Sequence, residues 1–201
     1  MTLFIATFNQ DFDLSRSSAT EEDREDIRLC THGDEEAYAR LVKRYEILIA
    51  RQMWRFTRSP QTLEELVQEV FVEAYTSLHS YKGTAPFEHW LRKIATRVGY
   101  KFWKHKSRDN ERRTTLEQNK LDIMPIATNA IPSEAAEYLF TLLETLPVQE
   151  RMVLSLLYFE GWDTQEIADH MGWSRSLVKV RAFRARKKLK TKLELAGYAS
   201  T

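Results

Sequence analysis

The chain has 201 residues, of which 43% are hydrophobic, and it contains only 6 Gly and 5 Pro. This hydrophobic content is enough to build buried cores, and the shortage of turn residues excludes a many-stranded β fold, so we predict an all-α protein. Thirty Lys and Arg residues are balanced by 29 Asp and Glu residues, which leaves a formal net charge of only +1.

Several functional classes are excluded by missing motifs. The single Cys30 cannot form an internal disulfide, and it lacks the Cys and His spacing of a zinc site. No apolar run reaches the roughly 18 residues that span a membrane, and we expect a reducing, cytoplasmic compartment. The sequence has no glycine-rich phosphate loop, paired metal-ligand motif or nucleophile elbow. We therefore expect no enzyme, no cofactor, no metal and no small-molecule substrate.

Residues 1–25 are predicted to form an acidic, mobile tail. Between Asp11 and Asp26 the chain carries seven acidic residues against two basic ones, with the polar sequence SRSSATEED at the centre. Such a segment has too few apolar side chains to build a packed core.

Residues 26–108 are predicted to form a bundle of three helices, each with one apolar stripe. Asp34 caps the first helix, and Thr62 with Glu65 forms a capping box for the second. The turn YKGTAP at 81–86 leads into the third helix. The stripes consist of Ala37, Leu41, Tyr45, Ile49 and Met53, of Leu66, Val70, Ala74 and Leu78, and of Phe87, Leu91, Ile94, Val98 and Phe102.

The bundle is followed by a predicted flexible linker and a second small helical domain. Residues 109–133 lose the helical periodicity and contain Pro125 and Pro132. Residues 134–197 regain it and form the second domain, with a break between helices at Pro147.

A helix-turn-helix is predicted inside this second domain. Asp163 and Glu166 form a capping box for a short helix, Gly172 closes that helix, and Ser174 caps the next one. In a helix-turn-helix the second helix lies in the major groove of DNA.

The second helix of this motif concentrates basic residues. Residues 173–190 contain eight Lys or Arg and no acidic residue. At about 100° per residue, one narrow side is apolar and the opposite side is mostly polar and basic. The apolar side carries Val178, Ala182, Ala185 and Leu189. The opposite side carries Ser176, Lys179, Val180, Phe183, Arg184 and Lys187.

These residue types suit the reading of duplex DNA. Arg and Lys bond to guanine edges or neutralise phosphates, and an exposed Phe183 can touch the methyl group of thymine. The alternative is a solvated basic helix with Phe183 buried against a neighbouring helix. We favour DNA binding because the caps, the turn and the outward Phe183 coincide.

A second candidate nucleic-acid surface lies on the predicted helix 86–107. Tyr100 and Trp103 fall on its polar side, and residues 97–113 contain seven Lys or Arg against two acidic residues. Interleaved aromatic and basic residues bind unpaired DNA, because bases stack on the rings and phosphates pair with the cations. The alternative is that Tyr100 and Trp103 pack against the carboxy-terminal domain or the tail. The basic residues of this segment include Arg97, Lys101 and Lys104.

The order of these features resembles bacterial RNA polymerase sigma factors of the extracytoplasmic-function (ECF) class. ELVQEVFVEAY at 65–75 resembles the family's helix that docks on the clamp helices of RNA polymerase β′. SYKGTAPFEHWLRKIA at 80–95 resembles the loop and helix that hold the flipped base of the minus-ten element. LETLPVQERMVLSLLYFEGWDTQEIADHMGWSRSLVKVRAFRARKKL at 143–189 resembles the reader of the minus-thirty-five element.

The resemblance implies three groups of site residues. Polymerase contacts fall on Glu65, Gln68, Glu69 and Phe71. Minus-ten DNA contacts fall on Lys82, Gly83 and Thr84, joined by Arg97, Tyr100, Lys101, Trp103 and Lys104 of the following helix. Minus-thirty-five contacts fall on Arg175, Ser176, Lys179, Arg181, Phe183 and Arg184.

The resemblance also implies a function and its partners. The protein would bind core RNA polymerase, at the β′ clamp helices and the β flap, and direct promoter-specific transcription initiation. A membrane-linked anti-sigma factor would hold it inactive. Two other classes remain open at this point: a stand-alone helix-turn-helix regulator, which would bind DNA tightly without polymerase, and a helical protein-interaction module.

Overall fold

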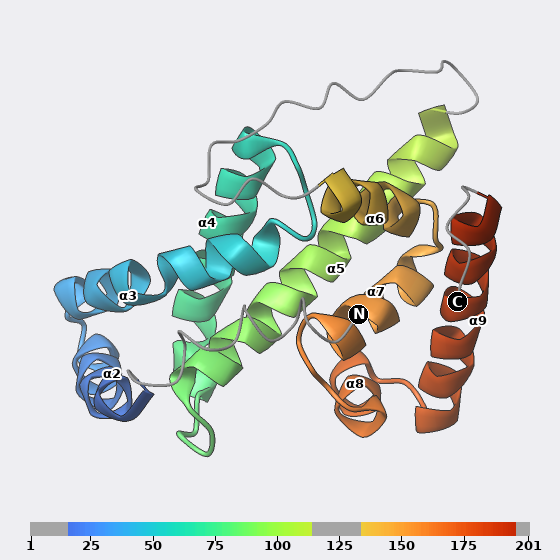
Figure 1. Cartoon of the computed structure of the whole chain (residues 1–201). Helices are drawn as coiled ribbons and strands as arrows, with labels where there is room; N and C mark the ends of the chain where they lie inside the picture. Colours follow the sequence, from blue (N-terminus) through green and yellow to red (C-terminus); the bar gives the residue numbers. More distant parts are fainter. Residues whose placement is uncertain (1–15, 114–133, 196–201) are drawn as a thin grey trace. The chain divides into compact units, whose positions relative to one another are not determined.

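Helices form all the regular secondary structure in the part of the chain that this computed structural model describes, residues 16–113 and 134–195 (Figure 1). The all-α prediction is confirmed. The elements are α2 Arg16–Thr31, α3 Glu35–Met53, α4 Pro60–Ser77, the 3-10 helix η1 Leu78–Ser80, α5 Phe87–Arg113, α6 Glu134–Glu144, α7 Val148–Tyr158, α8 Thr164–Met171 and α9 Arg175–Leu195. None of these helices is both long enough and apolar enough to cross a membrane.

The chain divides into two compact units at Gly99 and Tyr100, within α5. The sequence placed the end of the first domain at residue 108, where the apolar periodicity is lost. The helix itself continues through Arg113, because its basic residues are good helix formers that need no apolar partner. The rest of the predicted linker, residues 114–133, lies outside the described residues.

In the first unit, the predicted stripes of α3, α4 and the first part of α5 are buried. Members less than 5% exposed are Ala37, Leu41, Ile49, Met53, Leu66, Val70, Ala74, Phe87, Leu91, Ile94 and Val98. Gly99 lets α5 approach the turn after α3 closely, because a Cβ atom there would lie 2.4 Å from the ring of the buried Phe56. The three-helix bundle predicted from periodicity therefore exists.

The start of α4 differs from the prediction. Pro60 occupies the first turn, and the hydroxyl of Ser59 accepts a hydrogen bond from the Thr62 amide at 3.4 Å. Proline suits this position because its missing N–H is not needed there. Ser59, not Thr62, is thus the cap, and Glu65 accepts from Gln61 at 3.3 Å instead of completing a capping box.

Residues 16–25, which the sequence assigned to a mobile tail, form the first part of α2, and this corrects the prediction. Asp23 and Asp26 are buried against α3. Arg44 binds Asp23 at 2.5 Å and Asp26 at 2.9 Å, Arg40 binds Asp26 at 2.7 Å, and the Tyr45 hydroxyl donates to Asp23 at 2.5 Å. The sequence of this segment does not reveal the packing, because the partners of its acidic residues, Arg40, Arg44 and Tyr45, lie on the next helix.

This buried network should make Arg44 important for the stability of the first unit. Replacing Arg44 with Leu leaves two buried carboxylates undercompensated, and we expect the free energy of unfolding to fall by about 3 kcal/mol. Burial already raises the pKa of Asp23, against the opposing effect of its hydrogen bonds to Tyr45 and Arg44. A raised carboxyl pKa means that stability falls as pH increases through that pKa, and this dependence should steepen in Arg44→Leu.

Urea titrations followed by circular dichroism at several pH values measure both effects. Arg28→Leu is the matched control, because it breaks the exposed Arg28–Glu25 pair of α2 and should have much less effect. Equal effects of the two substitutions would contradict a structural role for the buried network.

The second unit is built around α9. Its core joins Leu143 of α6 and Leu146, just after that helix, to Leu154 of α7 and Ala185 of α9. Pro147 precedes α7, as the predicted break requires, and the last part of α5 belongs to this unit.

The helix-turn-helix forms as predicted. The Asp163 carboxylate accepts from the amides of Gln165 and Glu166 at 2.6 and 2.9 Å, and the Glu166 side chain accepts from the Asp163 amide at 2.8 Å. Gly172 has φ 67° and ψ 33°, a left-handed conformation that favours glycine. The Ser174 hydroxyl then accepts from the Leu177 amide at 3.2 Å and starts α9.

Candidate nucleic-acid interface

One narrow side of α9 is fixed in the core, and this determines which residues face solvent. Val178, Ala182 and Ala185 are at most 1% exposed. On the opposite side Phe183 is 64% exposed, and Lys179 and Arg184 are exposed beside it. The predicted orientation is confirmed, and the alternative in which Phe183 is buried is excluded for this structure.

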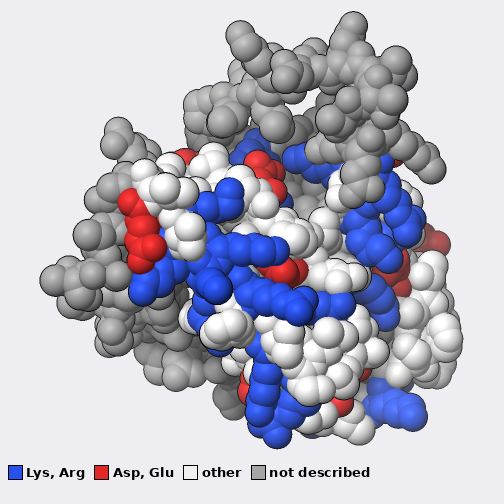
Figure 2. Space-filling model, turned by 90° about the vertical axis from the view of Figure 1, so that its right-hand side faces the viewer, with Lys and Arg blue, Asp and Glu red and all other residues white. Residues whose placement is uncertain are grey.

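Basic side chains dominate this surface. Helix α9 lies at the side of Figure 1 that faces the viewer in Figure 2, where Lys and Arg side chains gather with few acidic ones among them. No ion pair within the described residues involves Lys179, Arg184 or Lys187. Their positive charges are therefore available to a polyanion.

Two of the predicted minus-thirty-five residues have structural partners. The Arg181 guanidinium lies 3.9 Å from the ring centroid of Trp173 and donates to the Gln149 side chain at 2.5 Å. Burial lowers its pKa, an effect opposed by the charges of Tyr100 and Glu150. Arg175, at the exposed start of α9, donates to the Thr164 hydroxyl at 3.1 Å.

The loop between η1 and α5 is held in shape by aromatic contacts. Lys82, Gly83 and Thr84 are exposed, and Gly83 has φ 67°. The Tyr81 hydroxyl donates to the Ala85 carbonyl at 2.6 Å, and its ring lies 5.6 and 5.4 Å from the centroids of Phe87 and Trp90, respectively. The loop thus presents an exposed backbone on a packed aromatic base.

The two aromatic residues predicted to stack on unpaired bases are engaged within the second unit. Trp103 is only 3% exposed, and the guanidinium of Arg151 lies 3.8 Å from its ring centroid. Tyr100 makes an edge contact with Trp173 at 6.2 Å, and burial raises its pKa. Both rings contact carboxy-terminal residues of the second unit, which is the alternative that the sequence left open for them. Trp103 is therefore not an accessible stacking surface in this structure.

Basic residues of α5 remain on the surface. Arg97, Lys101 and Lys104 are all exposed, and Arg97 lies 3.6 Å from the Glu73 carboxylate. The Lys104 ammonium is 5.7 Å from the ring centroid of Tyr100. The cationic part of the predicted surface is thus accessible, whereas its aromatic part is covered.

A different kind of surface lies on α3 and α4. Of the predicted polymerase contacts, Glu65 and Gln68 are exposed and Glu69 is half-buried. Phe71 is only 7% exposed, since it packs into the bundle, and its carbonyl accepts a hydrogen bond from Tyr38 at 2.5 Å. The Phe71 side chain has little surface left for a partner.

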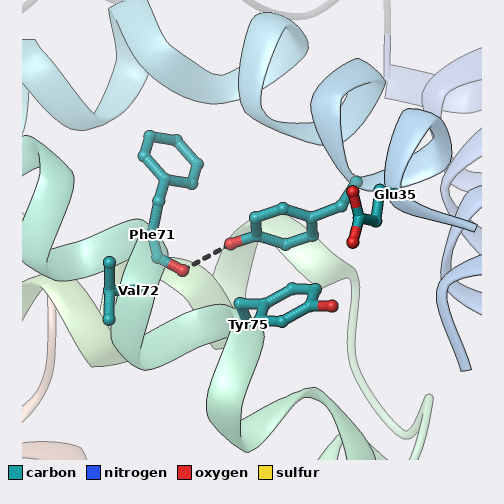
Figure 3. A pocket seen from close by; sticks show the side chains of 5 residues that line it. Glu35, Phe71, Val72 and Tyr75 are labelled. Carbon is teal, nitrogen blue, oxygen red and sulfur yellow. Dashed lines mark hydrogen bonds between the residues drawn. The ribbon is translucent and has the colours of Figure 1, made fainter. Parts of the chain in front are cut away.

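Exposed apolar residues that the prediction omitted lie on the same helices. Val72 and Tyr75 of α4 are 62% and 48% exposed, and Ile47 of α3 is 63% exposed. A shallow apolar pocket, drawn in Figure 3, is lined by Glu35, Tyr38, Phe71, Val72 and Tyr75. Val72 and Tyr75 belong to the motif ELVQEVFVEAY. Their positions around the helix, counted from the buried Val70 at about 100° per residue, could have shown that both side chains face away from the core.

No cluster of three or more metal-binding side chains occurs in the part of the chain that the structure describes. The surfaces therefore consist of an exposed basic helix, a basic loop region and an apolar helix face with carboxylates around it. This combination suits binding to DNA and to protein.

Comparison with known families agrees with this arrangement. Residues 41–109 match the family model "Sigma-70 region 2", and residues 136–189 match "Sigma-70, region 4". The ECF RNA polymerase sigma-E factors of Haemophilus influenzae and Escherichia coli K12 are 26% and 28% identical over 171 residues. The matches cover 81% of this chain and 90% and 89% of those proteins, respectively.

Solved structures show the same fold. CnrH, solved in complex with the cytosolic domain of CnrY, is 24% identical with a TM-score of 0.56, over 87% of this chain and 98% of that chain. The sigma factor RpoE of Bartonella quintana, solved with the anti-sigma factor NepR, is 17% identical with a TM-score of 0.57, over 78% and 96%.

Two regions in this order, a helical bundle followed by a helix-turn-helix, define a protein with sigma-70 regions 2 and 4. The chain belongs to the RNA polymerase sigma factors of the ECF class. This membership sets aside the stand-alone regulator and the interaction module as classes for the whole chain.

The structure predicts that two neighbouring arginines of α9 differ in role. Arg181→Ala removes the contact with Trp173 and the hydrogen bond to Gln149, so we expect the free energy of unfolding to fall by about 1–3 kcal/mol. Arg184→Ala should change stability by less than about 0.5 kcal/mol, because the side chain is exposed. It should instead weaken promoter binding by the holoenzyme and reduce the magnitude of the salt-dependence slope by about 1.

Urea unfolding of each variant and fluorescence anisotropy of the holoenzyme on promoter DNA at several salt concentrations separate the two roles. The assignment is wrong if Arg181→Ala is as stable as the parent and loses DNA affinity as Arg184→Ala does.

Proposed function

We propose that this protein binds core RNA polymerase through α3 and α4 and directs initiation at promoters that it reads with α9. The observation that carries this proposal is the exposed face of α9, which carries both basic and apolar side chains. This helix is the second helix of a well-formed helix-turn-helix. The loop at 82–84 and the cations Arg97, Lys101 and Lys104 would contact the minus-ten DNA. Glu65 and Gln68 would contact the polymerase, together with the exposed Val72 and Tyr75.

The covered aromatic residues of α5 limit their proposed role. Trp103 would contact melted DNA only if the contacts with Arg151 were released on the polymerase. Tyr100 would likewise have to leave Trp173. Arg97, Lys101 and Lys104 are exposed, so we assign the first minus-ten contacts to these cations.

We propose that an anti-sigma factor linked to the membrane controls this protein, which acts in the cytoplasm and is not an enzyme. CnrH and RpoE, which share the fold, were both solved in complex with a partner, CnrY or NepR. Segregated charge would support such control, because a partner with one basic and one acidic surface could cover acidic α4 and basic α9, respectively.

Transcription in vitro tests the function directly. Core RNA polymerase, the purified protein and a promoter library should give transcripts whose start sites depend on the protein. Phe183→Ala should lower promoter-specific initiation without weakening core polymerase binding, because Phe183 lies on the exposed side of α9. The proposal fails if no start site in the library depends on the protein.

The polymerase-facing surface can be tested with one charge. Val72→Glu should fold normally, because Val72 is 62% exposed. It should lower the affinity for core polymerase about tenfold or more, since a carboxylate would have to be desolvated in an apolar contact. Leu195→Glu is a matched control at the 83% exposed end of α9. Unchanged affinity of Val72→Glu in a fluorescence binding titration would place the polymerase contact elsewhere.

A further inference from the structure

The outer face of α9 has an apolar centre. Measured from the buried Val178 at about 100° per residue, Phe183, Lys187 and Val180 lie at about 140°, 180° and 200°. Lys179 and Arg184 lie on either side of them, at about 100° and 240°. The residue positions farthest from the core thus include two apolar side chains, and cations border them.

Val180 is as important to this arrangement as Phe183. It is 43% exposed, although valine has no polar group to interact with water. It precedes Phe183 by three residues, so the two side chains are neighbours on the helix surface. Single exposed apolar residues are common, but here two adjacent ones occupy the middle of a face whose other side chains are polar or basic.

The charges around this pair indicate the kind of partner. Lys179, Arg184 and Lys187 have no ion pair within the described parts of the chain, and Arg181 is turned toward Trp173 instead. A partner must therefore bring anionic groups at the edges and apolar groups at the centre. The major groove of DNA has this layout, because phosphates line its walls and the C5 methyl of thymine is the apolar group on its floor.

We propose that Val180 is a sequence-reading residue that contacts the C5 methyl group of a thymine in the minus-thirty-five element. The inference rests on the proposed promoter recognition by α9 and adds a residue and a base to it. Valine neither donates nor accepts a hydrogen bond, so it distinguishes thymine by the methyl group alone. Val180 and Phe183 are separated by about 4.5 Å along the helix, so the two side chains can reach the same or neighbouring base pairs.

Replacing thymine with deoxyuridine tests the contact, because it deletes only the methyl group. A promoter selected from the library is prepared with each thymine of the minus-thirty-five element replaced in turn. With the parent holoenzyme, one replacement should weaken promoter binding about three- to fivefold, the factor expected for one buried methyl group. With the Val180→Ala holoenzyme, that same replacement should have no further effect.

Leu195→Ala is the matched control, because it also removes exposed apolar surface from α9 but lies at the far end of the helix. Its holoenzyme should show the full deoxyuridine effect. Binding of each variant to core polymerase is measured in parallel and should equal that of the parent.

The possible results separate this inference from the proposed function. If the parent protein directs no specific initiation, the proposed function fails. If it initiates specifically but the deoxyuridine effect is the same in Val180→Ala, or the selected elements lack thymine, the role of Val180 is wrong and the proposed function stands. If Val180→Ala alters only the binding of a protein partner, the apolar pair is a protein contact instead.

Discussion

The burial of one narrow side of α9 determines how the rest of the second unit can work. Val178, Ala182 and Ala185 are small enough to bring the helix close to α7 and α8. Because the seam is narrow, most of the helix circumference stays outside the core. Rotation of α9 by even one residue position would bury a cation, which is costly, so the packing fixes the orientation of the exposed face.

Fixed orientation gives the basic residues different functions. Arg181 lies near the seam and uses its guanidinium on Trp173 and Gln149, whereas Lys179 and Arg184 remain open to solvent. These side chains carry the same charge, so charge alone does not distinguish them. Their distance from the seam separates a structural arginine from residues that are free to meet DNA.

The first unit uses charge in the opposite way. Asp23 and Asp26 are buried with Arg40 and Arg44, and they join α2 to α3. This network stabilises the bundle that presents the apolar residues of α3 and α4, so two residues of an acidic segment serve the fold. The near-zero net charge of the chain thus combines acidic residues that pair internally with basic residues that remain exposed.

The sequence by itself determined the helical class, the three stripes of the bundle, the helix-turn-helix and the outward side of α9. These features depend on local rules, namely the helical period, capping groups and the left-handed Gly172. Only the tertiary structure decided the packing of α2, the burial of Phe71 and Trp103, and the partners of Arg181. Each of these depends on a side chain distant in the sequence, such as Arg44, Tyr38, Arg151 or Gln149. Periodicity shows which way a residue points from its own helix, but not which other helix covers it.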